Sequence, residues 1–178
     1  LPAGEVTYGQ LYDVMPFGNG VALLDVDGAT LLELLRIGTS GAHGAVEVAG
    51  LKIRFDPRRD PCPTEDRNGD GIVDPHDRMR LETATLTDGT LIDPARIYRV
   101  VTNSFLARGG DGWGPTLRRL PDGAIQVRTD LPPVRDQVAA WLRERRPHLN
   151  GKDSPIPGHE RVMPLGPRPE SAPRCSTP

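Results

Sequence analysis

Proline and glycine divide the chain into short segments. The sequence has 20 Gly and 19 Pro in 178 residues, and Pro16, Pro57 and Pro147 each end a run with a helix or strand pattern. These short runs do not follow a regular strand-helix-strand alternation, which a doubly wound parallel sheet would require. The sequence therefore predicts the α+β fold class.

Helix starts are indicated by capping residues. Thr7 with Gln10 and Thr30 with Glu33 have the spacing of capping boxes, and Pro133 suits the first turn of a helix. The apolar runs that follow predict helices over 11–15, 31–35 and 133–146.

Strands are predicted where the sequence alternates or is rich in β-branched residues. These runs cover 21–27, 46–55, 81–91 and 97–102. Gly50 is expected to form a turn or bulge, and Asp88-Gly89 to form the turn of a hairpin within 81–91. The chain beyond Asn150 lacks periodicity, so we expect an extended strap there.

Charge and hydropathy exclude some partners. The net charge of -2 provides no broad positive field for a nucleic-acid backbone, and no apolar run reaches the ~20 residues of a membrane span. Leu1 is neither an initiator Met nor part of a signal pattern, so we expect the chain to begin inside a longer precursor. Cys62 and Cys175 permit a long-range disulfide without establishing one.

Two loops each place a phenylalanine beside small or polar residues. They are Pro-Phe-Gly-Asn at 16–19 and the Gly-rich stretch 103–113. Aromatic residues are only 4% of the chain, so an aromatic in a loop is a candidate ligand contact. In isolation, Phe17 would be expected in the core and Gly-Gly-Asp-Gly would be expected to form a tight turn. Trp113 fits a pocket wall or the core equally well.

The stretch Tyr98–Gly112, Tyr-Arg-Val-Val-Thr-Asn-Ser-Phe-Leu-Ala-Arg-Gly-Gly-Asp-Gly, resembles the 5'-nucleotidase C-terminal domain family. The similarity runs from Thr7 to Val162 and is interrupted by an insertion at 58–79. It implies mixed sheets with helices packed outside them in α/β/β/α layers. The expected domain covers 1–165 and is followed by a flexible, Pro-rich tail over 166–178.

The resemblance also implies a nucleoside or nucleotide ligand. Phe17 and Phe105 would enclose the base, Asn19 would contact its edge, Gly41 would approach it through the backbone, and Asp111 would accept hydrogen bonds from the ribose hydroxyls. Stacking between two aromatic rings suits any base, and a carboxylate disfavours analogues that lack the hydroxyls. The residues do not indicate which base or which nucleotide class is preferred.

Catalysis is not expected from this chain alone. The resemblance implies a two-metal centre, of zinc or manganese type, in an N-terminal metallophosphoesterase domain of the same precursor. The four histidines of this chain have no paired spacing. We therefore assign it no catalytic residue.

The insertion contains the spacing of an EF-hand-type calcium loop. Oxygen side chains occupy positions one, three, five, nine and twelve, which are Asp66, Asn68, Asp70, Asp74 and Asp77. Ile72 would offer its carbonyl, and Gly71 permits the sharp turn. Asp77 replaces the usual Glu, so the loop is more similar to dockerin-type loops; an acidic turn without metal is the alternative. Calcium and Cys62 both favour a periplasmic or extracellular setting.

Two other functions fit the same sequence. The chain could be a calcium-stabilised binding or adhesion module that kept the fold without catalysis, or a stand-alone nucleotide-binding protein. An upstream metallophosphoesterase segment in the precursor would favour the hydrolase. Its absence, together with failure to bind nucleosides, would favour the adhesion module.

Overall fold

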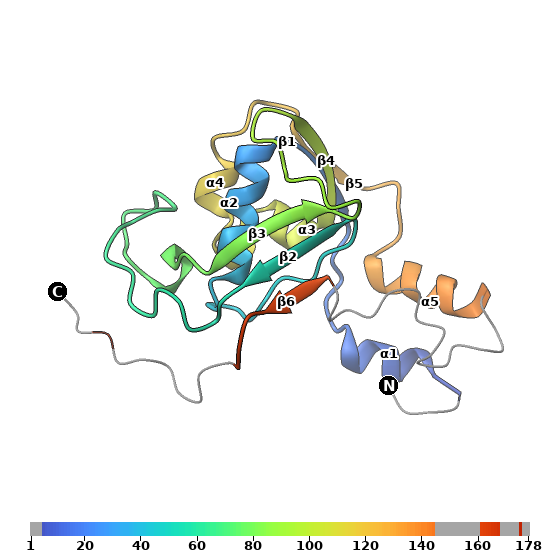
Figure 1. Cartoon of the computed structure of the whole chain (residues 1–178). Helices are drawn as coiled ribbons and strands as arrows, with labels where there is room; N and C mark the ends of the chain where they lie inside the picture. The colour runs from blue at the N-terminus through green and yellow to red at the C-terminus, as the bar shows by residue number, and fades with distance from the viewer. Residues whose placement is uncertain (1–4, 145–160, 168–174, 176–178) are drawn as a thin grey trace.

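Two three-stranded sheets form the framework of the chain (Figure 1). The computed structural model describes residues 5–144, 161–167 and 175. The first sheet is antiparallel, with the order β4 (Ile97–Asn103), β1 (Val21–Asp27), β5 (Ile125–Arg128). The second is mixed, with the order β3 (Leu81–Leu86), β2 (Leu51–Phe55), β6 (Val162–Pro164). The α+β class is confirmed.

Five α-helices and two 3-10 turns lie within the described part of the chain. They are α1 (Tyr8–Val14), α2 (Gly28–Thr39), η1 (Pro75–Asp77), α3 (Ser104–Ala107), η2 (Gly110–Gly112), α4 (Gly114–Leu117) and α5 (Val134–Glu144). The expectation that helices pack outside both sheets is wrong for α2, which contacts β1 and β4 of one sheet and β3 of the other. Leu31, Leu34 and Leu35 of α2 belong to one buried cluster that includes residues of both sheets, because one apolar helix can cover two sheet faces. Among the described residues, no helix is long and apolar enough to cross a membrane.

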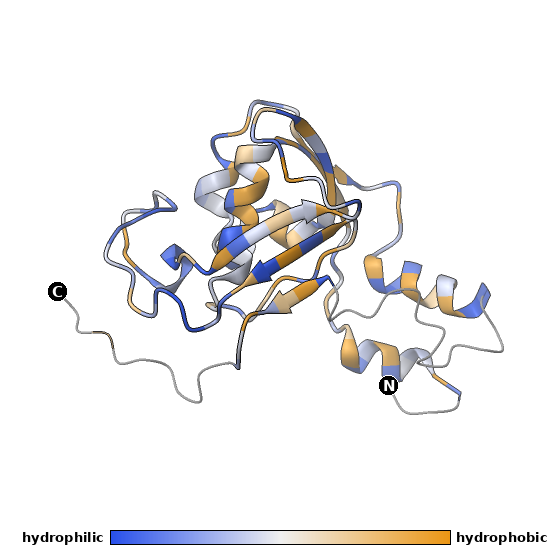
Figure 2. Cartoon of the chain, in the orientation of Figure 1, coloured by the Kyte–Doolittle hydropathy of each residue, from blue (hydrophilic) through white to orange (hydrophobic). Residues whose placement is uncertain are grey.

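The core forms between β1 and α2. Alternate residues of β1, namely Ala22, Leu24 and Val26, are almost fully buried, as expected when one face of a strand points to the core. From α2, Leu31, Leu34, Leu35 and Ile37 join them. Figure 2 shows apolar residues concentrated in the strands and in α2, whereas the 58–79 insertion is mainly hydrophilic.

One of the two predicted capping boxes is confirmed. Thr7 Oγ1 accepts from the Gln10 backbone N–H at 3.2 Å, and Gln10 Oε1 accepts from the Thr7 N–H at 2.9 Å. The predicted cap at Thr30 is wrong, because α2 begins earlier and Asp27 accepts from the Thr30 N–H at 2.7 Å. Glu33 pairs with Arg36 instead.

The predicted strand pairing is partly wrong. The strand expected over 46–55 begins only at Leu51, after Gly50 with its φ of +77°. The hairpin turn predicted at Asp88-Gly89 is confirmed, because the Leu86 N–H donates to the Thr90 carbonyl at 2.8 Å and the Gly89 N–H to the Leu86 carbonyl at 3.0 Å. Its second arm is shorter than a strand and pairs by a bridge between Thr85 and Leu91, while 97–103 pairs with β1. We did not predict β5 and β6, which are four and three residues long, because such short runs carry little pattern. The predicted end of α5, at 145–146, lies outside the described residues.

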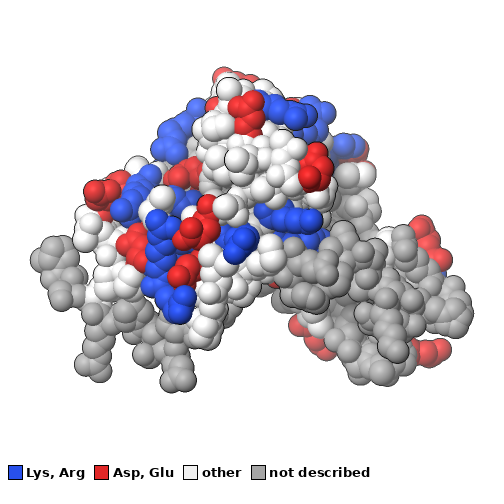
Figure 3. All heavy atoms as spheres, in the orientation of Figure 1, with Lys and Arg blue, Asp and Glu red and all other residues white. Residues whose placement is uncertain are grey.

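The insertion is attached to the rest of the chain by a covalent bond and by a surface ion pair. Cys62 is bonded to Cys175, which fixes one point of the segment predicted as a flexible tail; most of that segment lies outside the described residues. Arg59 pairs with Glu82 of β3, whereas the ion pair of Arg67 with Asp60 lies within the insertion. Figure 3 shows cationic and anionic side chains interspersed on this face.

Replacing the cap of α2 should destabilise the fold. At neutral pH, Asp27→Ala is expected to lower the free energy of unfolding by about 1 kcal/mol, because it leaves a helix N–H without a partner. The N–H of Thr30 lowers the pKa of Asp27. The stabilisation is therefore complete above the unfolded-state pKa of about 3.9 and is lost as the pH falls through the folded-state pKa.

Urea unfolding of both proteins at pH 7 and in acid would measure this effect. Asp27→Asn, which keeps an accepting cap oxygen, is the matched control and should unfold at pH 7 within about 0.5 kcal/mol of the parent. A difference between Asp27→Ala and the parent that does not narrow in acid would contradict the assignment.

Candidate nucleotide-binding site

The two phenylalanine loops lie side by side. The Gly20 N–H donates to Ser104 Oγ at 3.0 Å, and the Ser104 N–H donates to the Gly20 carbonyl at 2.8 Å. Phe17 precedes this junction by three residues, and Phe105 follows it directly. The Asn19 carbonyl accepts from the Val134 N–H at 2.9 Å, which also fixes the first loop to α5.

Both phenylalanine rings are exposed. Phe17 is 73% exposed and Phe105 48%, although burying such a ring would stabilise the fold by roughly 2–3 kcal/mol. The core position that Phe17 would be expected to take in isolation is therefore not the one observed. Trp113, by contrast, is 6% exposed and belongs to the core, and it also lines the cavity described below.

Phe105 also contacts the Gly-rich loop. A Cβ added at Gly110 would lie 2.4 Å from Phe105 Cε1, so only glycine lets the ring approach. Asp111 follows with a φ of +50°, in the left-handed region that Asp tolerates better than most residues. This conformation brings an Asp111 carboxylate oxygen to 3.6 Å from Nδ1 of His43.

Gly41 lies on the loop that leads to His43. It is exposed with a φ of +80°, and a Cβ there would meet the Arg80 guanidinium at 2.3 Å. Arg80 is itself almost buried, and burial lowers the pKa of its guanidinium. A side chain at position 41 is thus disfavoured by the backbone conformation, and it would also require the Arg80 guanidinium to shift.

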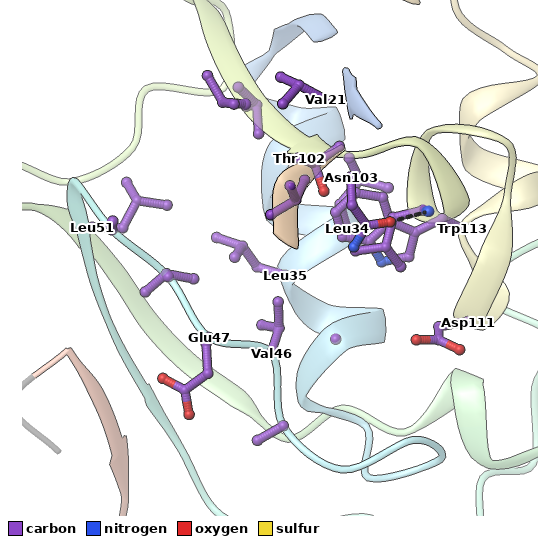
Figure 4. A pocket seen from close by; sticks show the side chains of 18 of the residues that line it. Val21, Leu34, Leu35, Val46, Glu47, Leu51, Thr102, Asn103, Asp111 and Trp113 are labelled. Atoms are coloured by element: carbon purple, nitrogen blue, oxygen red, sulfur yellow. Dashed lines mark hydrogen bonds between the residues drawn. The ribbon is translucent and has the colours of Figure 1, made fainter. Parts of the chain in front are cut away.

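A cavity of about 860 Å³ adjoins these loops. Its walls are mostly apolar and come from α2, residues 45–51, β4 and α5, and Asp111 projects at the end away from Leu51 (Figure 4). Of the five residues predicted to bind the nucleotide, Asp111 lines this cavity. The other four, Phe17, Asn19, Gly41 and Phe105, are not among its lining residues.

The acidic loop of the insertion folds around its own backbone. The two carboxylate oxygens of Asp66 accept from the Gly69 and Gly71 N–H groups at 2.7 and 2.8 Å, and the N–H of Gly71 lowers the Asp66 pKa. Asn68 and Asp77 are fully buried, and Asp77 accepts from the Asn68 N–H at 3.0 Å.

No calcium site is shown by this arrangement. Within the described ranges, no group of three or more Asp, Glu, His or Cys side chains is placed to hold a metal ion. The side chains of Asp70 and Asp74 accept from the N–H groups of Ile72 and His76, both within the loop. Each oxygen retains a second lone pair, so calcium stays a prediction.

The insertion contacts the Gly-rich loop through His76, which the sequence analysis did not single out. The buried Arg36 donates to the His76 carbonyl at 2.8 Å. A Cβ at Gly112 would lie 2.4 Å from Cδ2 of the His76 ring. His43 lies beside it, with the ring centroids 5.1 Å apart. Neither histidine has a spacing that would have identified it.

Comparison with known proteins places the chain in a family. The sequence profile of the 5'-nucleotidase C-terminal domain matches residues 1–119, which is most of the described domain. The chain therefore belongs to the 5'-nucleotidase C-terminal domain family.

Two curated relatives and one solved structure illustrate the similarity. A probable 5'-nucleotidase from Treponema pallidum is 32% identical over 62% of this chain and 18% of its own length. The cell wall protein Lmo0130 from Listeria monocytogenes is 30% identical over 76% of this chain and 16% of its own. The 5'-nucleotidase precursor from Thermus thermophilus has a TM-score of 0.67 and 26% identity, covering 94% of this chain and 29% of that one. The chain thus spans less than a third of each.

A methyl group at position 110 should displace the Phe105 ring. For Gly110→Ala we expect large changes in the aromatic NMR signals of Phe105, because the new Cβ would overlap the ring. With only three Phe in the sequence, these signals are readily assigned. Gly18→Ala is the matched control, since no neighbouring atom lies within 4 Å of a Cβ there. Unchanged Phe105 signals in Gly110→Ala would contradict the contact.

Proposed function

We propose that this chain recognises the base and ribose of a nucleotide on behalf of a 5'-nucleotidase-type hydrolase. The observation that carries the proposal is the pair of exposed rings, Phe17 and Phe105, on loops joined by the Gly20–Ser104 hydrogen bonds. Asp111 supports the proposal with a carboxylate, because it directly follows Gly110, whose missing side chain leaves room for the Phe105 ring.

Each residue of the proposed site has a distinct role. Phe17 and Phe105 stack on the two faces of the base, each worth roughly 1–3 kcal/mol. Asn19 contacts the base edge with its amide, and Gly41 approaches the base through its backbone. Asp111 accepts hydrogen bonds from the ribose hydroxyls, and a ligand without them would leave this carboxylate unpaired.

Hydrolysis in this proposal belongs to another part of the protein. A metallophosphoesterase domain preceding the present one would hold two zinc- or manganese-type ions, which activate water and stabilise the leaving oxygen. The present domain would hold the nucleotide by its base and ribose, leaving the phosphate free to reach those metals. We propose that it is inactive on its own.

A location outside the cytoplasm is part of the proposal. The Cys62–Cys175 disulfide supports it, because such bonds persist in oxidising compartments. One relative is described as a cell wall protein. Periplasmic and extracellular settings both fit these observations.

Removing one ring tests the proposed base site. Adenosine should bind the parent chain weakly and shift NMR signals in both phenylalanine loops, while Phe105→Ala should weaken binding about ten- to a hundredfold. Ile97→Ala is the matched control, because Ile97 is 64% exposed at the opposite end of β4. Equal affinities of the parent and Phe105→Ala would rule out the site, and a parent that does not bind adenosine would favour the adhesion module.

Calcium binding by the acidic loop is a separate proposal. Ligands from Asp66, Asn68, Asp70, Ile72, Asp74 and Asp77 would make the folded state bind calcium preferentially and raise the melting temperature. Thermal melts with calcium and with chelator, on the parent and on Asp70→Ala, would measure this. Glu65→Gln, exposed and outside the motif, is the control. Equal midpoints for the parent in both conditions would show that the loop is an acidic turn.

A further inference from the structure

His43 and Asp111 occupy the same end of the cavity. His43 Nδ1 lies 3.6 Å from Asp111 Oδ1, too far for a direct hydrogen bond. The two side chains are 52% and 41% exposed, so both have surface available to a ligand. A hydroxyl group entering this end of the cavity can therefore contact the imidazole and the carboxylate together.

The two side chains offer complementary chemistry. An ionised carboxylate only accepts hydrogen bonds, whereas a neutral imidazole has one donor and one acceptor nitrogen. Each hydroxyl of a vicinal diol is both a donor and an acceptor. A diol that donates to Asp111 still has oxygen lone pairs, and the His43 ring supplies a donor for them.

The insertion fixes the position of the His76 ring, which lies beside His43. His76 Nδ1 lies 3.0 Å from both carboxylate oxygens of Asp74, and the His76 backbone N–H donates to the same carboxylate at 2.7 Å. Its carbonyl accepts from the buried Arg36. These bonds leave the ring little freedom, and it lies against His43 at 5.1 Å between centroids with an interplanar angle of 32°.

The arrangement of His43, His76, Asp74 and Asp111 suits hydrogen bonding to a ligand better than metal coordination. Nε2 of His76 is buried without a partner, but it lies under Gly112, where a Cβ would be 2.9 Å away. Within the described ranges, His43, His76, Asp74 and Asp111 do not form a group able to hold a metal ion. The exposed polar atoms belong to His43 and Asp111, so these two are the ones that can meet a ligand.

We propose that His43 is a second ribose contact beside Asp111, and that His76 of the insertion is the residue that positions it. The inference rests on the proposed function, because it takes the ligand to be a ribonucleoside or ribonucleotide. It adds to that function a role for the insertion, which positions His43 through His76.

Selectivity between two nucleosides tests the role of His43. His43→Ala should weaken adenosine binding about two- to tenfold, the loss expected for one hydrogen bond, and leave 2′,3′-dideoxyadenosine binding unchanged. His43→Asn keeps a donor near the position of Nδ1 and should retain most of the adenosine affinity. NMR titrations of the full chain with each nucleoside measure the affinities of the parent, His43→Ala and His43→Asn. The amide spectra verify that each variant is folded.

A double-mutant cycle tests the positioning role of His76. His76→Ala should reduce adenosine affinity selectively, as His43→Ala does, but should cause no further loss when His43 is already Ala. His76→Phe retains a ring against His43 and Gly112 and should bind adenosine more tightly than His76→Ala. This rescue keeps the test informative if His76→Ala unfolds.

The outcomes separate the inference from the proposed function. If the parent does not bind adenosine, both fail. If the parent binds adenosine but His43→Ala binds it equally well, or weakens both nucleosides alike, only the ribose contact is overturned. Additive losses from His43→Ala and His76→Ala, or no gain in His76→Phe, overturn the positioning role.

Discussion

The antiparallel pairing of β1 with β4 determines where the candidate site can form. Val21 lies opposite Asn103, so the segment that enters β1 and the segment that leaves β4 meet at one end of the sheet. Asp25 and Arg99 face each other in the same register and form two hydrogen bonds of 2.7 Å. A shift of one residue would turn the buried face of β1 toward solvent and separate Gly20 from Ser104. Both phenylalanine loops therefore depend on this register.

Local sequence patterns predicted the elements that local interactions define. The capping box of α1 and the whole of β1 were predicted because a cap or an apolar, β-compatible run specifies them without distant partners. The start of α2 was misplaced by three residues, since Asp27 and Thr30 can both cap a helix. The pairing partner of 97–103, and β6 beside β2, could not be predicted in this way, because they depend on contacts far apart in the sequence.

The candidate site was likewise predicted only where local sequence carries a signal. The local sequence singled out the loops that carry Phe17 and Phe105, the family resemblance gave them a role, and the structure shows both rings exposed on joined loops. His43 and His76 carry no motif, and 33 positions separate them in the printed sequence. Only the docking of the insertion on α2, through Arg36 and the His76 carbonyl, brings them together. The insertion thus adds residues next to the candidate site that the motif of the Phe105 loop does not signal.

The Gly-Gly-Asp-Gly loop is shaped by two long-range constraints, the β1–β4 register and the docking of the insertion. Gly110 is required because the Phe105 ring, placed by the β1–β4 register, occupies the space of its missing side chain. Gly112 is required because the His76 ring, placed by the insertion, occupies the corresponding space on the other side of Asp111. Two contacts from unrelated parts of the chain therefore flank one residue whose own φ of +50° is strained. The direction of the Asp111 carboxylate is consequently set by its neighbours, which makes the insertion part of the site's geometry.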